Sequence, residues 1–165
     1  LHPDYPALLI GNHILGGGSL SSRLADRVRQ QEGLSYTVGS MYRTYAKEGH
    51  GRLMIYAISN PDNSDKVVKV VNEELTKLIT DGVTEEEVTK AVESNLQSSA
   101  VSRSTDSGIA GMLGSLLARD RDIQSTKDLE DQMMKLTPEQ VNSAIRKYLK
   151  PEKLIIITAG DFKKD

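Results

Sequence analysis

Cysteine is absent from this chain of 165 residues. Its absence excludes disulfide bonds, thiolate nucleophiles and cysteine-based metal sites, but it does not identify a cellular compartment. Long apolar runs are missing as well, since residues 154–158 fall far short of the roughly 20 residues that a membrane-spanning helix needs. The N-terminal residues are neither basic nor followed by a cleavable apolar segment. We therefore expect a soluble chain without a targeting peptide or membrane segment, and its location stays open.

An excess of positive charge is also lacking. Lys and Arg number 21 against 23 Asp and Glu, for a net charge of −2. We expect no nucleic-acid partner, because proteins that bind nucleic acids usually show a basic excess on one face or in one run. The histidines His2, His13 and His50 do not have the helical spacing of a His-x-x-x-His or His-x-x-Glu-His metal site. We therefore expect no metal site within this chain.

The N-terminal part of the chain shows a helical pattern. Residues 5–15 are apolar on nearly every side, which indicates a buried helix that ends at the glycines after it. A second helix, capped by Ser19, ends at Gly33. Arg23 is predicted to lie on its outer face. Its core stripe is predicted to consist of Leu20, Leu24 and Val28.

The middle and C-terminal parts are predicted to be mostly helical. A helix is expected over residues 66–80, and a shorter one carries Leu129 and Met133. Two further helices begin at capping boxes, in which a Thr is followed three residues later by Glu or Gln: Thr84 with Glu87, and Thr137 with Gln140. Another helix from about Asp106 is expected to pack through Ile109, Met112, Leu113, Leu116 and Leu117.

The strands are few. Residues 36–46 and 52–59 are predicted to form a hairpin with turn residues at 48–51, and the β-branched run 153–160 predicts a central strand. These features predict a single α+β domain over residues 1–165, with a mainly antiparallel sheet and helices packed on one face. Three strands are too few for this much helix. We therefore expect a fragment truncated at its N-terminal end, whose sheet edge favours self-association.

A glycine-rich segment, Gly16-Gly17-Gly18-Ser19, has three interpretations. As a phosphate loop it would indicate a nucleotide-binding protein, but it follows a helix and lacks the Gly-Lys-Ser/Thr ending. As a flexible corner between two helices it needs no ligand. It could also contact a peptide, because glycine lets the backbone approach a ligand closely.

Arg29 and Tyr36 lie on either side of a chain reversal. Arg29 falls in the last turn of the predicted helix, and Tyr36 opens the next strand, so both side chains can point toward one surface. A guanidinium and a phenol together are donors suited to an anionic or polarised carbonyl oxygen. A structural explanation stands beside this one, because arginine is favourable near a helix C-terminus and tyrosine is common in strands.

Several sequence segments, taken in order, span nearly the whole chain and carry a family resemblance. They are Asn12-His13-Ile14-Leu15-Gly16-Gly17-Gly18, Ser22-Arg23-Leu24, residues 28–38, Asp81-Gly82-Val83-Thr84-Glu85-Glu86-Glu87 and residues 155–161. In this order they resemble the second, metal-free homologous domain of the M16 zinc metallopeptidases, the family of insulinase, pitrilysin and the mitochondrial processing peptidase.

The resemblance implies a division of labour between two domains. A first domain, on the same polypeptide or in a partner subunit, holds Zn²⁺ through an inverted His-x-x-Glu-His motif and a distal glutamate. Arg29 would hold the backbone carbonyl of a peptide substrate, and Tyr36 would stabilise the tetrahedral intermediate. The segment Gly16, Gly17, Gly18 and Ser19 corresponds in position to a substrate-contacting loop. No residue of this chain corresponds to a zinc ligand.

The predicted function is therefore the non-metal-binding domain of a zinc-dependent endopeptidase, inactive when alone. The alternative is a non-catalytic structural or peptide-binding subunit of the same fold. A His-x-x-Glu-His motif in the parent chain or a neighbouring partner would favour the peptidase.

Overall fold

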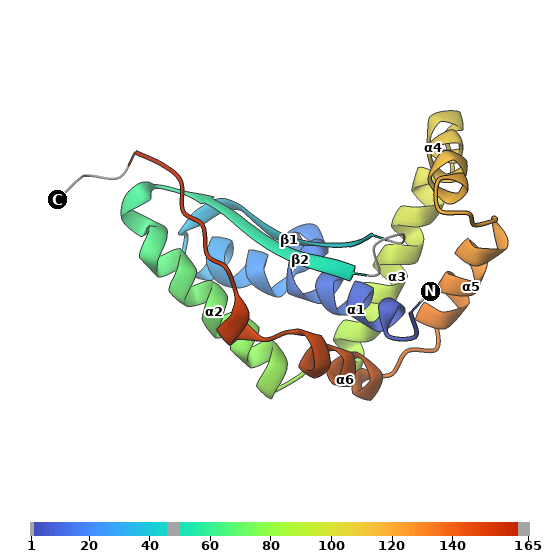
Figure 1. The fold of residues 1–165 in the computed structure, drawn as a ribbon. Coiled ribbons are helices and arrows are strands. Elements are labelled where there is room, and N and C mark those ends of the chain that lie inside the picture. Colours follow the sequence, from blue (N-terminus) through green and yellow to red (C-terminus); the bar gives the residue numbers. More distant parts are fainter. Residues whose placement is uncertain (1, 46–49, 162–165) are drawn as a thin grey trace.

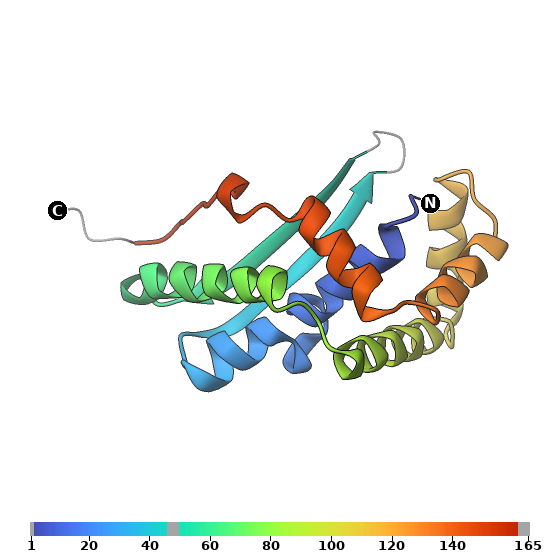
Figure 2. The same ribbon diagram turned by 90° about the horizontal axis from the view of Figure 1, so that it is seen from below.

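The computed structural model describes residues 2–45 and 50–161. Two layers make up the fold: a long β-hairpin, and a group of helices that covers one face of it (Figure 1 and Figure 2). This arrangement confirms the predicted α+β class with helices on one face of an antiparallel sheet.

The hairpin consists of β1 (Ser35–Tyr45) and β2 (His50–Ser59), which pair antiparallel. Side chains of β2 alternate: Leu53 and Ile55 pack against the core, whereas Met54, Tyr56 and Ile58 are exposed on the other face. Because β2 begins at His50, the predicted turn residues 50–51 are strand. The predicted strand residue 46 and turn residues 48–49 lie outside the described residues.

The first two predicted helices are present with changed details. Helix α1 (Tyr5–Asn12) continues into a π-helical turn, His13–Gly17. The second helix begins at residue 23, and most of it is a π-helix, Ala25–Gln31. It begins later than predicted, with the Ser22 hydroxyl accepting a hydrogen bond from the Ala25 amide. Leu20, predicted for the core stripe, therefore falls in a 3₁₀ turn and is 57% exposed.

The remaining helices follow the predicted order. They are α2 (Ser64–Thr80), α3 (Glu85–Ser102), α4 (Asp106–Leu117), α5 (Gln124–Met133) and α6 (Pro138–Tyr148). Both predicted capping boxes are present, at the N-termini of α3 and α6. Short 3₁₀ turns, Pro61–Asn63 and Pro151–Lys153, precede α2 and follow α6. No helix in the described ranges is long and apolar enough to cross a membrane.

The core lies between the hairpin and the helices. It joins α1, the helix that begins at residue 23, α2, α3, α5 and α6, and the inner face of the hairpin covers it. Its largest fully buried side chains are Ile10, Leu15, Leu24, Val28, Leu75, Leu78, Met133, Val141 and Ile145.

The predicted packing of α4 is wrong. The helix forms, but none of its residues is buried, and Leu113 and Leu117 are 47% and 78% exposed. Figure 1 shows the reason: α4 projects beyond the hairpin and the helices around α1. An apolar stripe predicts which face of a helix avoids water, but not which element covers it.

The predicted strand over residues 153–160 is also wrong. Lys153 is the last residue of the 3₁₀ turn Pro151–Lys153, and residues 154–160 pair with no strand that the structure describes. Ile155 and Ile157 are 88% and 85% exposed. β-branched residues favour an extended backbone, but a strand forms only where a neighbouring strand supplies hydrogen-bond partners.

Candidate functional site

Arg29 lies on the helix that leads into the hairpin. Leu24 and Val28 of this helix are completely buried, which fixes its orientation against the core. Arg29 follows Val28 directly, so its side chain emerges at the boundary between core and solvent and is half-buried. The π-helical geometry here was not predicted, because α- and π-helices place apolar residues at similar spacing over so short a segment.

Gly33 ends this helix and reverses the chain. Its φ of +61° is in the left-handed region, and the Leu34 amide donates a hydrogen bond to the Val28 carbonyl at 2.9 Å. This bond reaches one residue farther back than the corresponding bond of a Schellman motif, because the left-handed glycine ends a π-helix rather than an α-helix. Leu34 also packs against the core, so the turn is held by a hydrogen bond and by apolar contact.

Tyr36 follows this turn at the start of β1. Its side chain is 80% exposed, and the Arg29 Cζ atom lies 4.5 Å from the centroid of its ring. The structure thus brings the two predicted residues into direct contact on one surface. Within the described ranges neither side chain has a hydrogen bond or ion pair, so their polar donors are open to a ligand.

Acidic residues close to Arg29 in sequence are occupied elsewhere. Glu32 forms an ion pair with Arg27, and Asp26 accepts a hydrogen bond from the Gln31 side-chain amide at 2.6 Å. The charge of Arg29 is therefore not neutralised by its own helix. A cation over an aromatic ring is stabilised by about 0.5–1 kcal/mol when exposed, which is enough to orient the pair without fixing it.

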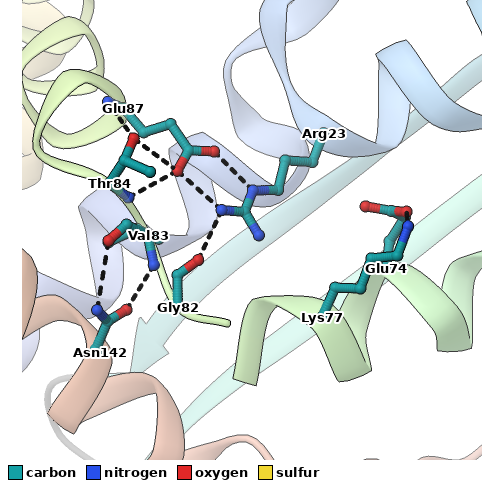
Figure 3. A network of polar contacts seen from close by, with 8 residues as sticks. All are labelled: Arg23, Glu74, Lys77, Gly82, Val83, Thr84, Glu87 and Asn142. Atoms are coloured by element: carbon teal, nitrogen blue, oxygen red, sulfur yellow. Dashed lines mark hydrogen bonds and ion pairs between the residues drawn. The ribbon is translucent and has the colours of Figure 1, made fainter. Parts of the chain in front are cut away.

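A polar network, missed by sequence reasoning, anchors the start of the same helix (Figure 3). Arg23 donates two hydrogen bonds to the Glu87 carboxylate, at 2.7 and 2.8 Å, and one to the Gly82 carbonyl at 2.7 Å. Asn142 of α6 holds the adjoining turn, since its side-chain oxygen accepts from the Val83 amide at 2.7 Å. The prediction that Arg23 faces outward was wrong: it is half-buried in this network.

The network also sets the charge states of its members. Hydrogen bonding to Glu87 raises the pKa of Arg23. Burial acts to raise the pKa of Glu87, but hydrogen bonds from Arg23 and the Thr84 amide outweigh it, so the pKa of this carboxyl is lowered. Both groups are charged at neutral pH. No local pattern links residues this far apart in sequence, although both lie in segments that carry the family resemblance.

The glycine-rich segment lies beside β1 and is partly internal. Gly16 is buried, and a Cβ there would lie 2.6 Å from the Ser40 amide nitrogen and 2.9 Å from the Gly39 carbonyl carbon. Gly17 is exposed and Gly18 is half-buried. Gly16 therefore allows two backbones to pack closely, and Gly17 is the most open of these three glycines.

The three histidines lie in different environments. Burial lowers the pKa of His13, so its imidazole is neutral at neutral pH, whereas His2 and His50 are exposed. Across the described residues, no three His, Cys, Asp or Glu side chains are grouped so that they could hold a metal ion. The described part of this chain therefore does not offer the set of ligands that zinc requires.

Comparisons with known proteins show which family this chain is similar to. The family model described as the peptidase M16 inactive domain matches residues 1–95, more than half of the chain. A Bacillus subtilis protein named as an uncharacterized zinc protease, YmxG, is 38% identical over 77 residues, which are 47% of this chain and 18% of that protein.

Two solved structures share most of the fold. A peptidase M16 inactive domain from Pseudomonas fluorescens matches 92% of this chain with a TM-score of 0.80 and 31% identity. A protease from Helicobacter pylori matches 91% with a TM-score of 0.78 and 21% identity, which shows the fold alone. This chain covers 35% and 36% of those chains, and it spans less than a fifth of the Bacillus subtilis protein.

Proposed function

The chain belongs to the family of peptidase M16 inactive domains, and from this premise we propose that it supplies Arg29 and Tyr36 to the active site of a zinc-dependent endopeptidase. One observation supports this role most directly. The Arg29 guanidinium lies 4.5 Å from the centroid of the Tyr36 ring, and the described residues engage neither group in a hydrogen bond. Donors without a partner among the described residues can bind a substrate without first breaking a hydrogen bond within that part of the protein.

Zinc would be held by a homologous domain, on the same polypeptide or in a partner subunit. The described residues of this chain offer no donor set for it. When bound there, the metal ion supplies the activated water that hydrolyses the peptide bond. The chain's own contribution would be to bind the substrate and to stabilise the charge that develops during the reaction.

The two side chains would act at successive stages. Arg29 presents planar donors that hold the backbone carbonyl of the peptide before and during reaction. The phenol of Tyr36 donates a hydrogen bond to the oxygen that gains negative charge in the tetrahedral intermediate. The exposure of Tyr36, at 80%, supports this role because its hydroxyl can reach a group outside the domain.

The glycine-rich segment has a smaller part in the proposal. Gly17 and Gly18 would contact the peptide backbone at the margin of the site, and Ser19 continues the same loop. Gly16 would act indirectly, by holding the loop against β1.

Steady-state kinetics of the complete protein tests the proposal. Tyr36→Phe keeps the ring but removes the hydroxyl, so kcat should fall about a hundred- to thousandfold. Arg29→Ala should also raise KM, because Arg29 would contact the bound substrate. Tyr56→Phe and Arg52→Ala are matched controls on β2, since both residues are exposed and lie outside the proposed site; their kinetics should stay close to those of the parent protein.

Unchanged kcat in Tyr36→Phe would contradict the catalytic role. In that case the non-catalytic structural or peptide-binding subunit would be the better account of this chain. Thermal unfolding of each variant separates loss of function from loss of folding.

A further inference from the structure

The start of β1 contains an irregularity that determines where Tyr36 points. Ser35 pairs with Ser59 of β2, and Thr37 pairs with its neighbour Ile58, so Tyr36 is an extra residue without a partner. This is a β-bulge, which interrupts the ladder and redirects the side chain at that position. Tyr36 and Thr37 are consecutive exposed residues, a break in strand alternation that the bulge explains.

Ser35 closes the bulge from the inside. Its side chain is almost fully buried, with 4% of the residue exposed. The hydroxyl oxygen lies 2.8 Å from the Thr37 carbonyl oxygen and 2.7 Å from the Ile58 carbonyl oxygen, so its proton is shared between two acceptors. These acceptors belong to the pair that restarts the ladder beyond Tyr36. One hydroxyl therefore ties the residue before the bulge to both strands after it.

We propose that Ser35 is a positioning residue, whose hydroxyl fixes the bulge so that Tyr36 faces the substrate beside Arg29. This inference rests on the proposed function of Tyr36. Without the hydroxyl, the extra residue can shift along the strand, and Tyr36 can pair with Ile58 while Thr37 becomes the bulge. A shift of one residue exchanges the faces to which side chains point. The Tyr36 phenol then leaves the surface that Arg29 shares.

Ser40 offers a matched control within the same strand. It is also 4% exposed, and its hydroxyl lies 2.8 Å from the side-chain oxygen and 3.3 Å from the carbonyl oxygen of Asn12. Replacing either serine by alanine removes a buried hydroxyl with two polar neighbours. Only Ser35 touches the bulge, so general damage to the strand and loss of positioning can be separated.

The experiment compares four further variants of the complete protein with the parent protein and with Tyr36→Phe. Ser35→Ala should lower kcat about ten- to hundredfold, approaching the loss caused by Tyr36→Phe, because molecules in the shifted register lack the Tyr36 phenol at the site, while KM changes less than about twofold. Ser35→Thr keeps the hydroxyl and should recover most of the lost kcat. Ser40→Ala should leave kcat within about twofold of the parent value. Adding Ser35→Ala to Tyr36→Phe should cause no further loss, since Ser35 acts through the Tyr36 hydroxyl.

A direct readout of Tyr36 separates this inference from the proposed function. With 3-fluorotyrosine at position 36, Ser35→Ala should shift or broaden the ¹⁹F resonance, and Ser40→Ala should not. If Tyr36→Phe lowers kcat but Ser35→Ala changes neither kcat nor the resonance, the positioning role is wrong and the catalytic role stands. Equal losses of kcat from Ser35→Ala in the parent and Tyr36→Phe backgrounds would also overturn it. If Tyr36→Phe leaves kcat unchanged, the proposed function fails, and this inference fails with it.

Discussion

Gly16 and Gly33 are glycines for different physical reasons. At Gly16 the limit is space, because a Cβ would lie within 3 Å of the Gly39 and Ser40 backbone atoms. At Gly33 a Cβ would meet no atom within 4 Å, and the limit is the φ of +61°, which costs other residues roughly 1–2 kcal/mol. The first glycine lets the π-helical turn His13–Gly17 pack on β1, and the second reverses the chain between Arg29 and Tyr36.

We expect Gly16→Ala to reduce the free energy of unfolding by about 1–3 kcal/mol, because backbone on β1 must shift to admit the methyl group. Gly111 is the matched control: it lies within exposed α4, and a Cβ there would meet nothing within 4 Å. Gly111→Ala should stabilise the helix by up to about 1 kcal/mol. Chemical denaturation measures both changes. If both substitutions change the free energy of unfolding equally, the close approach of Gly16 to β1 does not determine which residue is tolerated at position 16.

At the scale of secondary-structure elements, Glu87 joins two roles. Its side chain closes the capping box of α3, accepting from the Thr84 amide at 2.8 Å, and it also forms the ion pair with Arg23. The second role links α3 to the helix that carries Arg29 (Figure 3). Glutamine can fill the capping role as well as glutamate, so the charge can be removed while the cap is kept.

Glu87→Gln should reduce the free energy of unfolding at pH 7 by about 1.5–3 kcal/mol, the usual contribution of a hydrogen bond to a charged group. The pKa of Glu87 is lowered in the folded state, so its carboxylate stabilises the fold above the unfolded pKa of about 4.3. This contribution is lost as pH falls through the lowered folded pKa. The stability difference between parent and variant should therefore shrink below about pH 4.3, measured by denaturation at several pH values.

Glu86→Gln is the control for this prediction. The Glu86 carboxylate is exposed and, among the described residues, pairs with Lys90 alone, four residues along the same helix. Its removal should change stability much less than that of Glu87. If the difference in free energy of unfolding between the parent protein and Glu87→Gln stays constant with pH, the ion pair is not the source of that difference.

The elements also show what sequence can and cannot predict. The capping box of Thr84 and Glu87, and the shared surface of Arg29 and Tyr36, depend on residues close in sequence, and both were predictable. The ion pair between Arg23 and Glu87 depends on tertiary packing, which helical spacing does not reveal. The spacing therefore predicted Arg23 on the outer face of its helix. The prediction that Leu117 of α4 is buried is wrong for the same reason, because amphipathic spacing does not show which element covers the apolar face. The run 153–160 has strand propensity, but pairing requires a neighbouring edge.

At the scale of the whole molecule, the hairpin is covered on one side only. Met54, Tyr56 and Ile58 are exposed on its other face, and the described residues pair β2 with β1 alone. A cavity of about 740 Å³ lies between β2, α2 and residues 153–160. Its walls include Ile156 and Ile157, which belong to residues 154–160, a run without a charged side chain.

We expect the 165-residue chain to self-associate through this region, because an unpaired strand edge beside exposed apolar residues recruits other chains. Ile157, which is 85% exposed, lines the cavity beside β2, so Ile157→Lys should weaken association by about tenfold or more, equivalent to about 1.4 kcal/mol. Leu117→Lys is the matched control, since Leu117 is 78% exposed but belongs to α4, which projects from the other end of the molecule (Figure 1). Sedimentation velocity over a range of concentrations measures both. If the parent chain stays monomeric at every concentration, the unpaired edge of β2 does not mediate association. If Leu117→Lys weakens association more than Ile157→Lys does, the contact between chains is made by α4 instead.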